Sequence, residues 1–372
     1  GGEALAEALM SLTSLKELDF SENQISVQIS AVMFRAVCAA KALQRLYLDG
    51  NLPWPTSENC EVQVTAFTDQ LSGPLAVASL EVLSLRRCKM HSSGATKVFE
   101  SLSSNQTLRK LNLACNGIRQ SAANALAMML ASPSAIEELD LRDNRLGCQD
   151  ALAIAMQQVF LPGQTVTMES KLSASDSSEI EAKTVENNCL KTLNLGNNEI
   201  TGEALTRLTV AFSGLGALQE LYLYHNPYIG DLGAQALADV LSRGATQLLH
   251  LNLAACSIAD AGCQSLMVAI GEYKALKTLD VSCNAIGDDA AGSVSEVLAQ
   301  KDCQLEKLCL SMNCMSSYGI SKLMEGVAEN LDGSLREVDV ASQESGHAKT
   351  SFNEEIGGRN GPKVKSKFLG LR

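Results

Sequence analysis

The sequence has few aromatic residues, few histidines and no long apolar run, and each shortage excludes a class of protein. Phe, Tyr and Trp make up 4% of the 372 residues, so the core is not built on rings. No run of about 18 apolar residues occurs, which argues against a membrane-spanning helix. The four histidines show no metal-binding spacing, and phosphate-loop, dinucleotide-binding, Gly-x-Ser-x-Gly and His-Glu-x-x-His motifs are missing. We therefore expect no enzyme, no metal and no cofactor.

Positive charge is also scarce. The 30 Lys and Arg residues face 42 Asp and Glu residues, a net charge of −12. Proteins that bind nucleic acid need clustered cations against the phosphates, so we do not expect nucleic acid to be the main partner. The acidic excess has two interpretations, general solubility or an acidic docking face.

Leucine, in contrast, recurs at regular intervals. The pattern Leu-x-x-Leu-x-Leu-x-x-Asn, or a close variant of it, occurs eleven times. The copies begin at Leu15, Leu43, Leu80, Leu108, Ile136, Leu190, Leu218, Leu248, Leu276, Leu305 and Leu335. Most are 28 to 30 residues apart, and fixed periods of this size mark a solenoid of stacked repeats.

Each copy predicts a short strand followed by a helix. In Leu218–Asn226 the leucines at the fourth and sixth places alternate with outward side chains, as in a strand with one buried face. Apolar residues in 229–241 recur every three to four positions behind a Gly/Asp turn, as in an amphipathic helix. Strands pack about 4.8 Å apart and helices about 8–10 Å apart, so the stack must curve. The predicted fold class is an α/β solenoid of horseshoe shape, with a parallel concave sheet and convex helices.

The residue that ends each motif predicts a ladder of buried side chains. An amide there can bond backbone groups of neighbouring turns that lie too deep for water, and a thiol can fill the same slot as a weaker donor. The expected ladder residues are Asn23, Asn51, Cys88, Asn116, Asn144, Asn198, Asn226, Cys256, Asn284 and Asn313, with Gln343 in the last copy.

These motifs resemble a known family. The segment Leu248–Leu266, with Leu251, Leu253 and Cys256 in the motif, is similar to the long repeat of ribonuclease-inhibitor-like leucine-rich-repeat proteins. The resemblance covers roughly residues 1–343 and implies the fold. It does not choose a function, because that family includes enzyme inhibitors, innate-immune sensor domains, Ran GTPase-activating proteins and axonemal or cytoskeletal scaffolds.

The twelve cysteines follow the repeats and form no Cys-x-x-Cys pair. We therefore predict reduced thiols and a cytoplasmic location, with a cytoskeletal or axonemal one as the alternative. The sequence begins as the helix of a preceding repeat would, so we expect earlier residues in the natural chain.

The predicted domains are a repeat domain over 1–343 and a polar, then basic, tail over 344–372. Two insertions, about 52–79 and about 161–189, interrupt the repeats, and such segments commonly serve interaction or regulation. The first holds Trp54 between two prolines, a stiffened ring that could bind a partner or fold back over the helices.

The third, fifth and seventh places of each motif are expected to face the concavity. Opposite charges then fall on neighbouring strands and can pair, each pair contributing about 0.2–1 kcal/mol. The expected pairs are Glu17 with Arg45, Asp49 with Arg86, Lys110 with Glu138, and Lys307 with Glu337.

Aromatic residues on this face are the candidate partner-binding site. Tyr222, Tyr224, His225 and Tyr228 lie within seven residues of each other, and tyrosine is enriched at binding hot spots. Small residues in the flanking repeats, among them Gly196, predict that the rings stand proud of the surface. The candidate binding residues are Tyr47, Trp54, Tyr222, Tyr224, His225 and Tyr228.

We therefore predict a non-catalytic scaffold that binds a protein partner through the concave face and the insertions. One alternative is a GTPase-activating module resembling the Ran activators. The other is a structural subunit of a larger complex, such as an axoneme or an organellar assembly. None of the three involves nucleic acid or membrane insertion.

Overall fold

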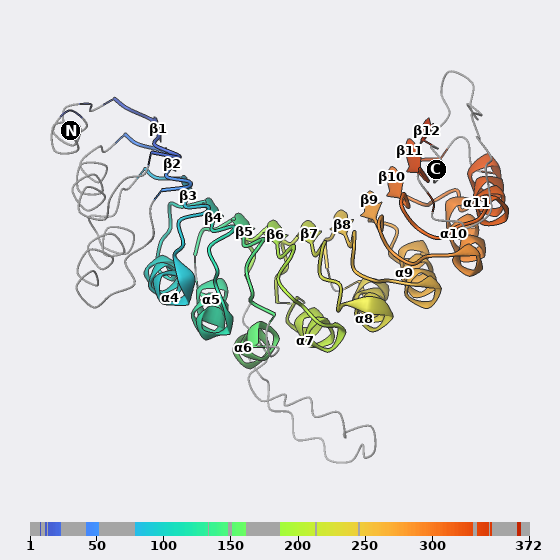
Figure 1. The fold of residues 1–372 in the computed structure, drawn as a ribbon, viewed down its shortest axis with the longest axis horizontal. Coiled ribbons are helices and arrows are strands. Elements are labelled where there is room, and N and C mark those ends of the chain that lie inside the picture. Colours follow the sequence, from blue (N-terminus) through green and yellow to red (C-terminus); the bar gives the residue numbers. More distant parts are fainter. Residues whose placement is uncertain are drawn as a thin grey trace, which may run out of the picture.

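The computed structural model describes residues 8, 12, 14–23, 42–51, 79–132, 134–147, 151–160, 187–212, 214–244, 246–329, 333–341, 343 and 363–365. One parallel sheet runs through them, with its strands side by side in sequence order along the inner side of an arch (Figure 1). The strands are β1 (Glu17–Asp19), β2 (Arg45–Tyr47), β3 (Val82–Ser84), β4 (Lys110–Asn112), β5 (Glu138–Asp140), β6 (Thr192–Asn194), β7 (Glu220–Tyr222), β8 (His250–Asn252), β9 (Thr278–Asp280), β10 (Lys307–Cys309), β11 (Glu337–Asp339) and β12 (Lys363–Lys365).

Helices line the outer side of the arch, one behind each strand from β3 to β10 (Figure 1). They are α4 (His91–Leu102), α5 (Ala123–Ala131), α6 (Ala151–Phe160), α7 (Gly202–Phe212), α8 (Gly230–Ser242), α9 (Asp260–Tyr273), α10 (Ala291–Leu298) and α11 (Ser317–Glu329). Short 3-10 turns, η2 (Gln120–Ala122) and η4 (Asp288–Ala290), precede α5 and α10. The predicted solenoid, with a concave parallel sheet and convex helices, is confirmed.

The alternation of leucines builds the core between these two layers. Leu221 and Leu223, at the fourth and sixth places, are 1% and 0% exposed. Glu220 and Tyr222 on either side of Leu221 remain partly exposed. The same alternation recurs in most strands of the sheet, so the outward places are those that the sequence predicts.

The ladder is present and joins successive repeats. The side chain of Asn226 is fully buried, and its amide nitrogen donates to the carbonyl oxygens of Leu195 and Leu223 at 3.0 and 2.6 Å. Its amide oxygen accepts the backbone N–H groups of Asn198 and Ile200 at 2.9 and 3.0 Å. One side chain therefore satisfies four buried backbone groups in two repeats.

The variants fill the same slot with fewer bonds. The Cys256 thiol donates to the carbonyl of Leu223 at 3.3 Å, and the Cys88 thiol donates to that of Leu48 at the same distance. Burial raises the pKa of both thiols to about 12, so they stay protonated as donors. Gln343 ends the ladder by donating to the carbonyl of Leu310 at 2.7 Å.

A second, shorter ladder of carboxylates ties the helices together, and the sequence analysis missed it. Asp231 at the start of α8 accepts the backbone N–H groups of Ala259 and Gly262, at the start of α9, at 2.7 and 3.0 Å. Asp260 does the same for the turn before α10. The starts of α9 and of the turn before α10 are thus capped by the repeat before them, since the first N–H groups of a helix have no partner within it.

The eighth place of the motif always adopts the left-handed conformation in the described repeats. Its φ lies between 51° and 66°, although glycine occurs there once. The residues are Glu22, Gly50, Arg87, Cys115, Asp143, Asn197, His225, Ala255, Cys283 and Met312. Side chains in this conformation cost on the order of 1 kcal/mol each, which the stacking of repeats must offset.

Most of the insertions and of the tail lie outside the described residues, and so does Trp54. Within the tail, β12 pairs in parallel with β11, so the sheet continues one strand beyond the eleven motif strands. The nine cysteines that the structure describes are all free thiols.

We predict that Asn226→Ala lowers the free energy of unfolding by about 3 kcal/mol, because four buried backbone groups lose their partner. Cys256→Ala, at the equivalent place in the next repeat, is its control and should cost about 1 kcal/mol, since a thiol makes weaker bonds. Urea unfolding followed by circular dichroism measures both. Equal losses of unfolding free energy in the two variants would contradict the role of the ladder amide.

Candidate functional site

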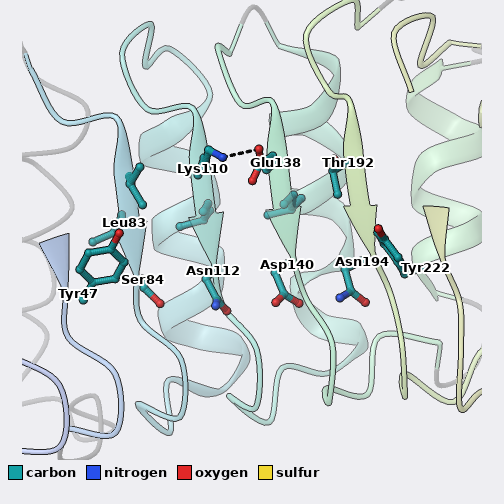
Figure 2. A pocket seen from close by; sticks show the side chains of 13 residues that line it. Tyr47, Leu83, Ser84, Lys110, Asn112, Glu138, Asp140, Thr192, Asn194 and Tyr222 are labelled. Atoms are coloured by element: carbon teal, nitrogen blue, oxygen red, sulfur yellow. Dashed lines mark hydrogen bonds and ion pairs between the residues drawn. The ribbon is translucent and has the colours of Figure 1, made fainter. Parts of the chain in front are cut away.

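An open hollow of about 300 Å³ lies on the concave face and crosses the strands from β2 to β7. Tyr47 stands at one end and Tyr222 at the other (Figure 2). Both come from the fifth place of their motifs, which predicts an outward side chain. Between them lie fifth-place residues with small polar side chains, namely Ser84, Asn112, Asp140 and Asn194.

The floor of the hollow is fixed by local hydrogen bonds. Asn112, Asp140 and Asn194 each accept the backbone N–H two residues further on, at 3.0, 3.1 and 3.0 Å. Each therefore keeps one polar atom for another partner. Asp140 directs its second oxygen to Nε of Arg142 at 3.3 Å, and burial raises the pKa of this carboxyl.

An ion pair between β4 and β5 forms one side of the hollow, as the sequence predicts. Lys110 Nζ lies 2.5 Å from Glu138 Oε1, and these two side chains point toward one another in Figure 2. Outside the hollow, the described ion pairs include Arg45 with Glu17 at 2.7 Å and Lys307 with Glu337 at 3.7 Å. All three pairs are at least partly exposed to solvent, so each contributes at most about 1 kcal/mol.

The fourth expected pair, Asp49 with Arg86, is wrong. Asp49 Oδ1 instead accepts the Ser84 hydroxyl at 2.5 Å and the backbone N–H of Arg86 at 2.9 Å. The Ser84 hydroxyl and the Arg86 backbone N–H lie closer to the Asp49 carboxylate than the Arg86 guanidinium does. Nε of Arg86 has no hydrogen-bond partner.

Tyr222 and Tyr224 of the seventh repeat are half-buried and do not stand proud, which corrects the expectation from the flanking small residues for these two rings. A Cβ atom placed on Gly196 would lie 2.5 Å from Cζ of Tyr224, so this ring lies directly over the glycine. Its hydroxyl accepts from the amide of Asn194 at 3.5 Å. The small Gly196 therefore leaves room for the Tyr224 ring to pack on the sheet, and the ring does not project from it.

The other rings of this cluster differ in exposure. The Tyr222 hydroxyl donates to Glu220 Oε2 at 2.9 Å, and both Tyr222 and Tyr224 are half-buried. The His225 ring meets the Tyr224 ring edge-on, with centroids 5.8 Å apart. Tyr228 is 67% exposed on the rim. The structure thus brings Tyr222, Tyr224 and His225 together, while Tyr47 stands five strands away at the far end of the hollow.

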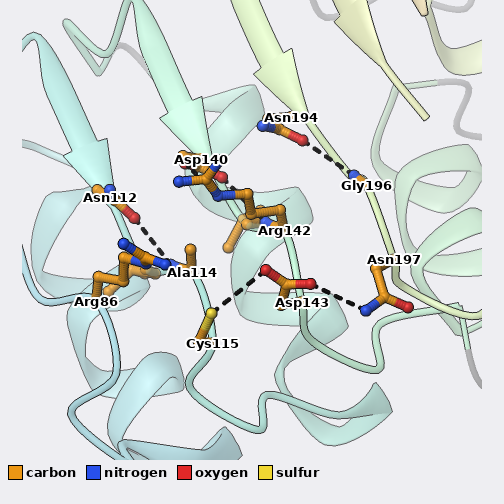
Figure 3. Close-up of polar contacts among 12 residues, drawn as sticks. Arg86, Asn112, Ala114, Cys115, Asp140, Arg142, Asp143, Asn194, Gly196 and Asn197 are labelled. Atoms are coloured by element: carbon orange, nitrogen blue, oxygen red, sulfur yellow. Dashed lines mark hydrogen bonds and ion pairs between the residues drawn. The ribbon is translucent and has the colours of Figure 1, made fainter. Parts of the chain in front are cut away.

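Two arginines from the seventh place enter this face, and the sequence analysis did not count them as candidates. Figure 3 shows Arg86 and Arg142 on the two sides of the small Ala114. Although burial opposes it, hydrogen bonding to Tyr224 and the charge of Asp140 raise the pKa of Arg142. Tyr224 and Arg142 therefore form one connected polar surface with the floor of the hollow.

In the part of the chain that the structure describes, no three His, Cys, Asp or Glu side chains gather as metal ligands would. Each described helix is too short or too polar to cross a lipid bilayer. Tyr222 is the group with the most perturbed ionisation on this face, and its pKa is raised to about 12, away from that of an activated nucleophile.

Comparison with known proteins places this architecture among repeat proteins. Residues 11–28, 104–127, 186–208, 218–238, 245–267 and 275–295 match the family model described as Leucine Rich repeat. The chain is 28% identical over 267 residues to ribonuclease inhibitor of Sus scrofa, covering 71% of this chain and 58% of that protein. It is 27% identical over 340 residues to ribonuclease inhibitor of Mus musculus, covering 90% and 66%.

A third relative is NACHT, LRR and PYD domains-containing protein 5 of Homo sapiens. The identity is 26% over 300 residues, covering 80% of this chain and 24% of that protein. The chain therefore spans less than two thirds of the length of these curated relatives.

We predict that Tyr222 ionises near pH 12 because of its burial and its bond to Glu220. The folded-state pKa exceeds the ordinary value of 10.0, so the stabilisation is complete below pH 10 and is lost as the pH rises through about 12. Glu220→Gln should lower the Tyr222 pKa, and Glu337→Gln, the same change four repeats away, should leave it unchanged. Carbon-13 NMR of labelled tyrosine measures both, and an unshifted Tyr222 in Glu220→Gln would refute the assignment.

Proposed function

Because the chain is a ribonuclease-inhibitor-like leucine-rich-repeat protein, we propose that it is a non-catalytic scaffold that binds a protein partner on its concave face. The observation that carries this proposal is the hollow between Tyr47 and Tyr222. Its two ends are aromatic and its floor carries polar side chains. Apart from the core residues Leu83, Leu111 and Leu139, its side chains come from outward places of the motif.

The dimensions of the hollow favour a protein segment as the occupant. Five strand spacings of about 4.8 Å separate Tyr47 from Tyr222, a span of roughly 24 Å. An extended peptide of about seven residues covers that length. The amides and the carboxylate on the floor offer both donors and acceptors to a peptide backbone, while the two tyrosines offer anchors at its ends.

The tyrosines at the seventh-repeat end are also held in place before binding. Tyr224 lies over Gly196 and contacts Asn194, and Tyr222 is bonded to Glu220. Side chains that are already ordered lose little entropy when a partner packs on them. His225 and the exposed Tyr228 extend the same contact surface onto the rim.

We expect Tyr222→Ala/Tyr224→Ala to weaken binding by about 30-fold or more, because hot-spot tyrosines contribute about 2 kcal/mol each. Affinity capture from native cells with mass spectrometry identifies the partner, and its dissociation constant is then measured for each variant. The control is Tyr318→Ala, the same kind of change at one tyrosine of α11, which is 71% exposed on the helical side. Gly196→Ala should give a smaller loss, because it displaces the Tyr224 ring without removing it.

The outcomes of this experiment separate the scaffold from its alternatives. A partner lost from the double variant and kept by Tyr318→Ala supports the concave site. A small GTPase lost in the same way would favour a regulator of GTP hydrolysis. Many subunits of one assembly retained by both variants would contradict the concave site and favour a structural subunit that binds elsewhere.

A further inference from the structure

Exposed cations gather in the turns that follow β3, β4 and β5, where the chain leaves the sheet toward the helices. They are Arg87, Lys89, Arg119 and Arg145, hereafter the basic rim. The side chains of Arg87 and Arg145 are 59% and 57% exposed, and Lys89 and Arg119 are also exposed. These turns border the part of the concave face shown in Figure 3.

The charge of the basic rim is only partly neutralised. Arg87 lies 3.7 Å from Glu22, and Arg145 lies 3.4 Å from Glu199, both in exposed pairs that contribute little. No ion pair joins Lys89 or Arg119 to an acidic side chain within the described ranges.

Asp143, the acidic residue described within these turns, already accepts two hydrogen bonds. The carboxylate of Asp143 accepts from the Cys115 thiol at 3.3 Å and from the Asn197 amide at 2.9 Å, as Figure 3 shows. It therefore faces its neighbours in the turn, and the basic rim keeps a net positive charge.

The backbone brings two of these cations side by side. Arg119 and Arg145 are opposite residues in an isolated parallel bridge, and the N–H of Arg145 donates to the carbonyl of Ile118 at 2.7 Å. Like charges directly opposite each other on paired strands destabilise the fold. An anion held between them would remove that repulsion.

The basic rim is also specific to this part of the solenoid. The equivalent turns after β8, β9 and β10, at 254–259, 282–287 and 311–316, contain no Lys, Arg, Asp or Glu. A chain with a net charge of −12 has no general excess of cations to scatter there. The concentration in three consecutive repeats is therefore a local feature of the surface.

We propose that the basic rim binds an acidic segment, rich in Asp or Glu, of a protein partner. Arginine forks bind carboxylates through two parallel hydrogen bonds, and three of the four cations are arginines. A nucleic acid is the less favoured ligand, because an extended polyanion is repelled by the net negative charge beyond the rim. This surface goes beyond the proposed concave site and does not include its tyrosines.

The test uses a fluorescein-labelled polyglutamate peptide, with binding followed by fluorescence anisotropy at low and at physiological salt. Wild type is compared with Lys89→Glu/Arg119→Glu. The control is Arg243→Glu/Lys301→Glu, which makes the same change in charge at two exposed residues on other turns. We expect at least a tenfold loss of affinity for the rim variant and less than a twofold change for the control, with binding that weakens as salt rises.

Three results would overturn the proposal. Equal losses in the rim variant and the control would show that only net charge matters. Tighter binding of a labelled single-stranded oligonucleotide than of the peptide, lost in the rim variant, would assign the rim to nucleic acid. Loss of peptide binding in Tyr222→Ala/Tyr224→Ala would show that the two surfaces are one. Circular dichroism confirms that each variant is folded, and retained peptide binding by the tyrosine variant keeps this test independent of the concave site.

Discussion

The structure depends on one constraint, which is that buried backbone groups in the turns after each strand must find hydrogen-bond partners without water. Asn226 meets this need for four groups at once, and Asn116 and Asn284 do the same in their repeats. The bonds run between repeats, so each repeat completes the next. Carboxylates such as Asp231 apply the same solution to the starts of the helices. Stacking is therefore enforced by polar groups as well as by leucines.

The inward and outward places of the motif have separate roles, and the outward places are left available for function. Leucines and ladder residues occupy the inward places, and the fifth-place amides use one atom to bond their own turn. What remains on the concave face is a row of polar atoms between Tyr47 and Tyr222, held by a rigid sheet. A neighbouring set of cations occupies the turns after β3 to β5. The proposed scaffold would offer a partner two kinds of contact, an aromatic and polar hollow and the basic rim beside it.

The sequence predicts the fold well because its signals are local and repeated. Alternating leucines place each strand, and Asn or Cys at the ninth place marks the ladder, so the register of Lys110 with Glu138 follows directly. The features that the sequence does not predict depend on how the side chains of neighbouring repeats pack against one another. Tyr224 lies over Gly196 because this neighbour has room for a ring. The predicted pair of Asp49 with Arg86 does not form, because the Ser84 hydroxyl bonds the Asp49 carboxylate instead. The left-handed eighth place carries no residue signature, since side chains as different as Arg87 and Met312 adopt it.

The most direct test of this account is hydrogen exchange of the backbone amides that the ladder binds. The N–H groups of Asn198, Ile200, Cys256 and Ile258 all donate to ladder amides. Stacking enforced by the ladder predicts that these amides exchange slowly and together, at the rate set by unfolding of the whole array. Fast exchange in any one of these repeats, while its leucine-bearing strand stays protected, would show that apolar packing alone holds the solenoid and would contradict the account.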